Sequence, residues 1–60
     1  KSFEKAAYWY KKAAIHGYPE AQYNLGLLYY NGLGVKTDLR QADFWMRRAK
    51  ESGLRIPDNM

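Results

Sequence analysis

The chain repeats part of its own sequence at a constant offset of 36 residues, from Ala6 to Ala42 and from Trp9 to Trp45. Segment 5–17 (KAAYWYKKAAIHG) aligns with segment 41–53 (QADFWMRRAKESG), and a lysine pair in the first is matched by an arginine pair in the second. A fixed period of this length is typical of helical solenoids, whose units bury their apolar faces by stacking on neighbours. The repeat therefore predicts an all-α fold that presents a binding surface.

Composition limits the fold to one small domain held together by helix packing. A chain of 60 residues buries only about 60% of the surface that its unfolded form exposes. There is no cysteine for a disulfide or a thiolate metal site, while six Tyr, two Trp and two Phe provide large contact areas. The net charge of +4 favours an acidic partner weakly.

Nothing in the sequence indicates a membrane span or a cellular address. No apolar run approaches the roughly 18 residues of a transmembrane helix. The chain begins with Lys1 and shows no signal-peptide pattern. We therefore expect it to be part of a longer protein, in a compartment that this sequence leaves open.

Three helices are predicted, over about 3–15, 19–30 and 38–52, each ended by a glycine or an Asn-Gly pair. Ser2, Pro19 and either Thr37 or Asp38 supply the helix starts. Gly26 costs about 1 kcal/mol in a helix interior, which predicts a close approach of another backbone. Helical spacing predicts one apolar stripe per helix that faces the core, the inner stripe. In the first helix it is Phe3, Ala6, Tyr10 and Ala13, with Trp9 beside them. In the second it is Ala21, Leu25, Leu28 and Tyr29, and in the third it is Leu39, Ala42, Trp45, Met46 and Ala49. Short connections make neighbouring helices antiparallel.

Segment 21–38 (AQYNLGLLYYNGLGVKTD), with the Gln-Ala, Trp, Ala and Gly that follow it, closely resembles the Sel-1-like repeat, a family related to tetratricopeptide repeats. The resemblance covers nearly the whole chain. Residues 3–17 correspond to the second helix of one repeat, 20–53 to one complete repeat, and 54–60 to a tail. The sequence departs from the pattern at Lys50, which replaces the second alanine of an Ala-Ala pair, and the first repeat lacks its leading helix.

The resemblance implies a right-handed superhelix of helix pairs, an alpha-alpha solenoid, whose concave face is built from the first helix of each pair. It implies an adaptor that binds another protein or peptide, with no catalytic residues and no cofactor. A cysteine-rich bacterial branch of the family is linked to penicillin binding. That property does not transfer to a chain without cysteine.

The second helix supplies the candidate partner-binding residues. If its inner stripe faces the core, the adjacent stripe is Glu20, Tyr23, Leu27, Tyr30 and Asn31. By analogy with tetratricopeptide repeats this stripe faces the groove, where partly exposed Tyr and Leu side chains contact a ligand. The alternative is that a helix of a preceding repeat covers these side chains.

Two further functions are weaker alternatives. Lys11-Lys12 and Arg47-Arg48 occupy equivalent positions, so stacking should place them on one ridge, roughly 10 Å apart. Nucleic-acid binding would require interleaved aromatics on that face. The position on outer helices and the small net charge favour a solvated convex face instead. A penicillin-type binder or hydrolase needs a polar pocket with an activated nucleophile, and the sequence offers no candidate.

The two ends of the repeat differ in polarity. Ala7, Ala14 and Ile15 of the first helix are replaced by Asp43, Lys50 and Glu51 in the third. Because terminal units need a polar outer face, this pattern predicts that the third helix lies at or near the C-terminal edge of the solenoid.

The first helix, in contrast, carries large apolar residues without its partner helix. Phe3, Trp9 and Tyr10 should leave apolar surface open and promote self-association. If the helix pairs stack regularly, Trp9 and Trp45 should occupy matching sites one repeat apart.

Overall fold

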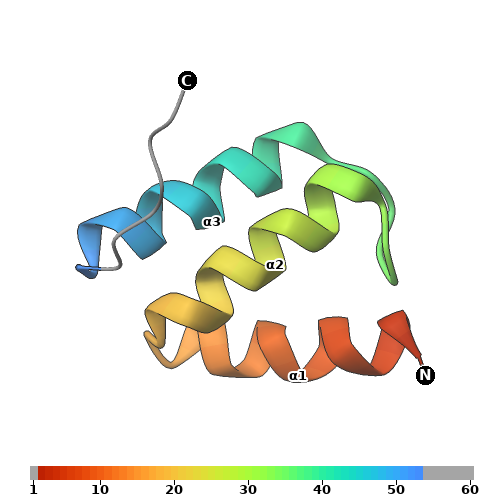
Figure 1. Cartoon of the computed structure of the whole chain (residues 1–60), viewed down its shortest axis with the longest axis horizontal. Coiled ribbons are helices and arrows are strands. Elements are labelled where there is room, and N and C mark those ends of the chain that lie inside the picture. Colours follow the sequence, from red (N-terminus) through yellow and green to blue (C-terminus); the bar gives the residue numbers. More distant parts are fainter. Residues whose placement is uncertain (1, 54–60) are drawn as a thin grey trace.

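The computed structural model describes residues 2–53, and within this range the chain is helical with no strand. Helix α1 spans Phe3–Ile15, α2 spans Pro19–Asn31 and α3 spans Leu39–Glu51. Figure 1 shows consecutive helices running antiparallel, with α1 and α3 on opposite sides of α2. Both outer helices pack on α2. The predicted all-α architecture of three helices is confirmed, and the predicted tail, 54–60, lies outside the described residues.

Local capping chemistry explains where the helices begin. The Ser2 hydroxyl accepts a hydrogen bond from the Lys5 amide at 3.2 Å, so it caps α1. The Asp38 carboxylate accepts from the amides of Arg40 and Gln41 at 3.1 and 3.2 Å, which makes Asp38 the cap of α3. Pro19 opens α2, where its missing amide hydrogen costs nothing. None of the described helices is long and apolar enough to cross a membrane.

The core is centred on Leu25 of α2, which is fully buried and clusters with the buried residues Ala14 and Ala21. The predicted inner stripe of α2 is confirmed: Ala21, Leu25 and Leu28 are buried, and Tyr29 is half-buried. Four half-buried side chains from all three helices pack around this centre: Tyr10, Ala13, Tyr29 and Trp45.

The face of α1 that is most deeply buried differs from the predicted one. Ala7 and Ala14 are its buried residues, whereas Phe3 of the expected stripe is exposed. In α3 the buried residues are Ala42 and Ala49, which correspond to Ala6 and Ala13 in the repeat. The cause is geometric: α1 and α3 pack on opposite sides of α2, so they turn different faces of the same repeat pattern toward it.

For the same reason the two tryptophans do not share the same environment, contrary to expectation. Each makes an edge-to-face contact with the aromatic residue before it, at 5.1 Å between ring centroids for Tyr8–Trp9 and 4.9 Å for Phe44–Trp45. Trp45 packs against the core, but Trp9 is 63% exposed because α2 does not cover that side of α1.

A buried glutamine connects all three helical segments. Gln22 of α2 has no exposed surface, and its amide nitrogen donates to the Ala14 carbonyl oxygen at 3.1 Å. Its amide oxygen accepts from the Ser52 hydroxyl at 3.5 Å. The C-terminal ends of α1 and α3 are therefore linked through one polar side chain of α2.

Gly26 lies where α2 and α3 approach each other. An added Cβ would lie 2.8 Å from Met46 Cγ and 3.1 Å from the Ala42 carbonyl oxygen. This confirms the close approach predicted from a glycine within a helix, since any larger residue would push α3 away.

The turn between α2 and α3 folds back onto α1. The Leu33 amide donates to the Leu28 carbonyl and the Asp38 amide to the Tyr29 carbonyl, both at 3.0 Å. Between these anchors, Gly34 has φ +75° and lies against the backbone of Phe3 and Glu4. The turn therefore contacts the first residues of α1, although about thirty positions separate them in the sequence.

Candidate functional site

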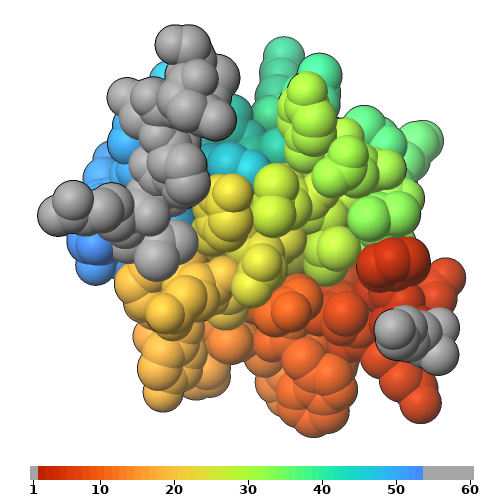
Figure 2. All heavy atoms as spheres, viewed as in Figure 1, coloured from red at the N-terminus to blue at the C-terminus, as the bar shows by residue number. Residues whose placement is uncertain are grey.

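Two hollows lie on either side of α2, and Leu27 lines both. On the face drawn in Figure 2, the surface of α2, yellow to green, lies open between α1 and α3. Leu27 is half-buried and belongs to both linings, so its side chain lies between the two hollows, and we name it the Leu27 ridge. The arrangement gives a continuous uneven surface centred on the C-terminal half of α2.

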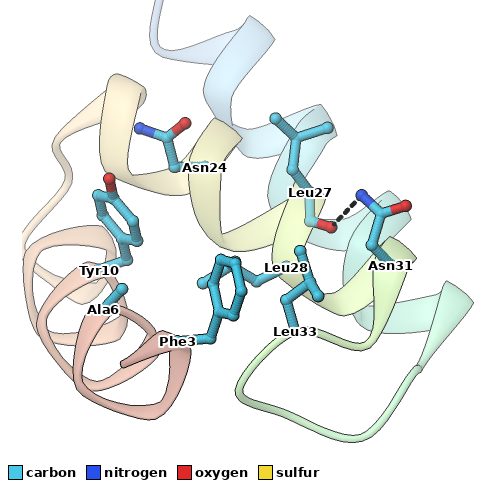
Figure 3. A pocket seen from close by; sticks show the side chains of 8 residues that line it. All are labelled: Phe3, Ala6, Tyr10, Asn24, Leu27, Leu28, Asn31 and Leu33. Carbon is cyan, nitrogen blue, oxygen red and sulfur yellow. Dashed lines mark hydrogen bonds between the residues drawn. The ribbon is translucent and has the colours of Figure 1, made fainter. Parts of the chain in front are cut away.

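The first hollow has a volume of about 330 Å³ and lies between α1 and α2. In Figure 3 the Phe3 ring stands in its middle, with Tyr10 on the α1 side and Leu33 on the turn side. The Asn31 amide nitrogen donates to the Leu27 carbonyl oxygen at 3.0 Å, which holds that side chain at the rim. Its lining residues are Phe3, Ala6, Tyr10, Asn24, Leu27, Leu28, Asn31 and Leu33.

The second hollow is larger, about 530 Å³, and lies between α2 and α3. Its lining residues are Leu27, Tyr30, Leu39, Ala42, Asp43 and Met46. The lining is mostly apolar, and its one charged member, Asp43, pairs with Arg47 at 3.0 Å in an exposed ion pair.

The repeat builds one wall of each hollow from equivalent positions. Leu39, Ala42 and Met46 of α3 correspond, at the offset of 36 residues, to three α1 residues of the first hollow: Phe3, Ala6 and Tyr10. The two hollows are thus related by the repeat, and α2 supplies the wall that they share.

The structure brings three of the five candidate partner-binding residues together at this surface. Leu27 lines both hollows, Asn31 lines the first and Tyr30 lines the second. Glu20 and Tyr23 line neither hollow, because the α2 residues that line the hollows begin only at Asn24. Their contact with a partner stays a prediction, as it does for the other three.

Three lining residues, Asn24, Leu33 and Asp43, belong neither to the candidate stripe nor to the predicted inner stripes. Asn24 precedes Leu27 by three positions, and Asn31 follows Leu27 by four, so helical spacing places all three on one face. That spacing was an available signal for Asn24. For Leu33 the sequence indicates an apolar residue that plugs a glycine-rich turn, but it does not show that this residue reaches the hollow, because its place depends on how the turn folds back.

The hollows offer apolar contact and a few hydrogen-bonding groups. Asparagine amides and tyrosine hydroxyls can each donate and accept hydrogen bonds at the rims. Among residues 2–53 there is no cluster of three or more His, Cys, Asp or Glu side chains that could hold a metal ion. Such a surface suits the apolar side chains of another chain.

Comparison with known proteins identifies relatives across most of the chain. The family model of the Sel1 repeat matches residues 1–18 and 19–54. An uncharacterized protein of Neisseria meningitidis serogroup B is 45% identical over 51 residues, which cover 85% of this chain and 11% of that protein. Chitin synthase regulatory factor 3 of Schizosaccharomyces pombe is 40% identical over 54 residues, 90% of this chain and 6% of the relative.

A third relative, the ERAD-associated E3 ubiquitin-protein ligase component HRD3B of Arabidopsis thaliana, is 43% identical over 42 residues. That alignment covers 70% of this chain and 7% of HRD3B, so the chain spans only a small part of each of these relatives. No solved structure gave a significant match. The match of the family model to both segments, together with the helical repeat seen in the structure, shows that the chain belongs to the Sel1 repeat family.

Proposed function

We propose that this chain is a non-catalytic protein-interaction module whose contact surface consists of the two hollows and the Leu27 ridge between them. Membership of the Sel1 repeat family supports this role, since Sel1 repeats are commonly found in adaptors. Two relatives carry names of the same kind, a regulatory factor and a component of a ubiquitin ligase.

The proposal is carried by one observation: large, partly exposed side chains lie beside the apolar hollows that the fold already forms. Tyr30 is 61% exposed at the rim of the second hollow, and Leu27 remains half-buried between both. Tyrosine is enriched among residues that dominate binding energy because its contact area is large and its side chain has few rotatable bonds. Hollows next to such a side chain can accept apolar groups of a partner.

Replacing Tyr30 by alanine should therefore weaken partner binding about 5- to 30-fold, the usual effect of truncating one central contact residue. Partners captured by the full chain would be identified, and their dissociation constants then measured by titration. The matched control is Tyr18→Ala, because Tyr18 is equally exposed at 62% but lies at the opposite end of α2, away from both hollows.

The expected result is a loss of affinity in Tyr30→Ala and unchanged affinity in Tyr18→Ala. Equal affinities for both variants and the unmodified chain would contradict the proposed surface. Circular dichroism would verify that each variant keeps its helices, since neither side chain belongs to the core.

Self-association through the open face of α1 is a second prediction, supported by the 63% exposure of Trp9. Phe3 and Tyr10, which were expected on the same open surface, line the first hollow instead. We expect the apparent mass in sedimentation to rise with concentration. Trp9→Lys should shift this rise to higher concentrations, because it removes the largest apolar contact and adds like charge to both copies. A mass that does not change with concentration would contradict the prediction.

A further inference from the structure

Seven of the ten basic residues of the chain lie on the two outer helices. Helix α1 carries three lysines and one glutamate, a net charge of +2, and α3 carries three arginines, one lysine, one aspartate and one glutamate, also +2. Helix α2, which supplies the shared wall of the hollows, has Glu20 as its one ionised side chain. The surface around the hollows and the surface of the outer helices are thus electrostatically different.

On each outer helix a basic side chain lies over the aromatic ring of the residue four positions before it in the sequence. Lys12 Nζ is 5.3 Å from the centroid of the Tyr8 ring, and the Arg48 guanidinium carbon is 5.7 Å from the Phe44 ring centroid. The two pairs occupy equivalent positions of the repeat. We name them the outer pairs: Tyr8–Lys12 and Phe44–Arg48.

The outer pairs face away from α2. The side chains of Tyr8 and Phe44 are 56% and 48% exposed, and both cations are exposed. With 100° between successive helical residues, each pair lies on the half of its helix opposite the buried alanines. Contact between a cation and a ring restricts the rotamers of the long basic side chain, which lowers the entropy cost when that cation binds a partner.

We propose that each outer pair binds an acidic segment of a partner protein in which carboxylates alternate with apolar side chains, since the two pairs lie on helices on opposite sides of α2. This inference rests on the proposed interaction function but uses a different surface. Charge complementarity identifies the carboxylates, since both helices are net positive. The exposed rings of Tyr8 and Phe44 beside the cations supply apolar contact for the residues between the carboxylates.

The same observations favour a peptide over a nucleic acid. Nucleic-acid binding depends on dense neutralisation of phosphates, and here Arg47 is already paired with Asp43 while Glu4 and Glu51 lie on the same helices. One face of each outer ring is also taken by its own cation. Sparse carboxylates on a peptide match this arrangement better than a continuous row of phosphates.

The test uses the full chain and a fluorescent synthetic peptide of glutamates interleaved with phenylalanines. A second peptide, with glutamine in place of every glutamate, controls for apolar contact alone, and a single-stranded oligothymidylate controls for nucleic acid. We expect the acidic peptide to bind in low salt and to weaken as salt screens the charges. The glutamine peptide and the oligothymidylate should bind at least tenfold more weakly.

Variants then locate the binding surface. Lys12→Glu/Arg48→Glu should weaken the acidic peptide by more than tenfold, whereas Lys36→Glu, which reverses an exposed cation in the turn after α2, should have little effect. Tyr8→Ala/Phe44→Ala, which keeps both cations, should weaken binding about threefold through loss of the ring contacts.

Three results would overturn the inference. If Lys36→Glu weakened acidic-peptide binding as much as Lys12→Glu/Arg48→Glu, only the net charge of the chain would matter. Tighter binding of oligothymidylate than of the acidic peptide would assign the surface to nucleic acid. Loss of the acidic peptide in Tyr30→Ala, with no loss in Lys12→Glu/Arg48→Glu, would place the peptide in the hollows. That last result would leave the proposed function intact. If Tyr30→Ala did not weaken the binding of captured partners, the proposed function would be contradicted, but this inference would not.

Discussion

Gly34→Ala is expected to lower the free energy of unfolding by about 2 to 4 kcal/mol. The positive φ of Gly34 costs a residue with a Cβ about 1 to 2 kcal/mol. The added Cβ would also overlap the Phe3 carbonyl oxygen and lie 2.8 Å from the Glu4 nitrogen, and such overpacking costs about 1 to 3 kcal/mol more. A chain of this size has only about 3 to 5 kcal/mol to lose.

Gly17→Ala is the matched control for this variant. Gly17 also has a positive φ, 95°, but an added Cβ there would meet nothing within 4 Å. It should therefore show the conformational cost alone, about 1 to 2 kcal/mol. Denaturant unfolding followed by tryptophan fluorescence and circular dichroism would measure both, and equal losses would show that the turn and α1 accommodate the added Cβ without strain.

The consequence of Gly34→Ala reaches the candidate site. Leu33 and Phe3 line the first hollow from the turn and from α1, so a turn pushed away from α1 widens that hollow. In conditions where the variant is still folded, a partner that uses the first hollow should bind it more weakly. Gly17→Ala should not change that affinity, because Gly17 lines neither hollow.

The extents of the helices could be predicted from the sequence because their signals are local. Ser2, Pro19 and Asp38 act within a few residues of their own positions, and glycines stop α1 and α2 just beyond their ends. The inner stripe of α2 was also predictable, since this helix is covered on both sides and its buried residues follow one simple pattern.

The face of α1 could not be predicted in the same way. Helical spacing identified an apolar stripe but not the direction from which α2 approaches it, and Ala7 and Ala14 turned out to be the buried positions. The comparison of repeats nevertheless held the necessary signal. Those same positions become Asp43 and Lys50 in α3, where they are exposed. The residue is alanine where this position of the repeat faces α2, and it is charged where the same position faces solvent.

The candidate site shows the same division between local and non-local information. Leu27, Tyr30 and Asn31 were identified because helical spacing alone places them together. Leu33 reaches the first hollow only because the turn folds back on α1, a contact between residues about thirty positions apart. Gln22 was missed as a core residue since a lone glutamine gives no apolar signal, although it is fully buried.

Gln22→Glu should destabilise the fold by about 3 to 4 kcal/mol at neutral pH, the cost of an uncompensated buried charge. The Gln22 amide nitrogen donates to the Ala14 carbonyl oxygen at 3.1 Å, and a carboxylate cannot donate there. Gln22→Met removes both hydrogen bonds but adds no charge. It should cost only about 1 kcal/mol, since the Ala14 carbonyl still accepts from the Gly17 amide at 3.0 Å.

The pH dependence separates charge from lost hydrogen bonds. Burial raises the pKa of a carboxyl group in the folded state above its unfolded value of about 4.3. The penalty in Gln22→Glu is therefore full above the folded pKa, and it disappears as the pH falls toward about 4, where both states are protonated. The difference in unfolding free energy between Gln22→Glu and Gln22→Met should accordingly shrink on acidification. If that difference stays constant with pH, this position is hydrated and the link between the ends of α1 and α3 does not depend on a buried amide.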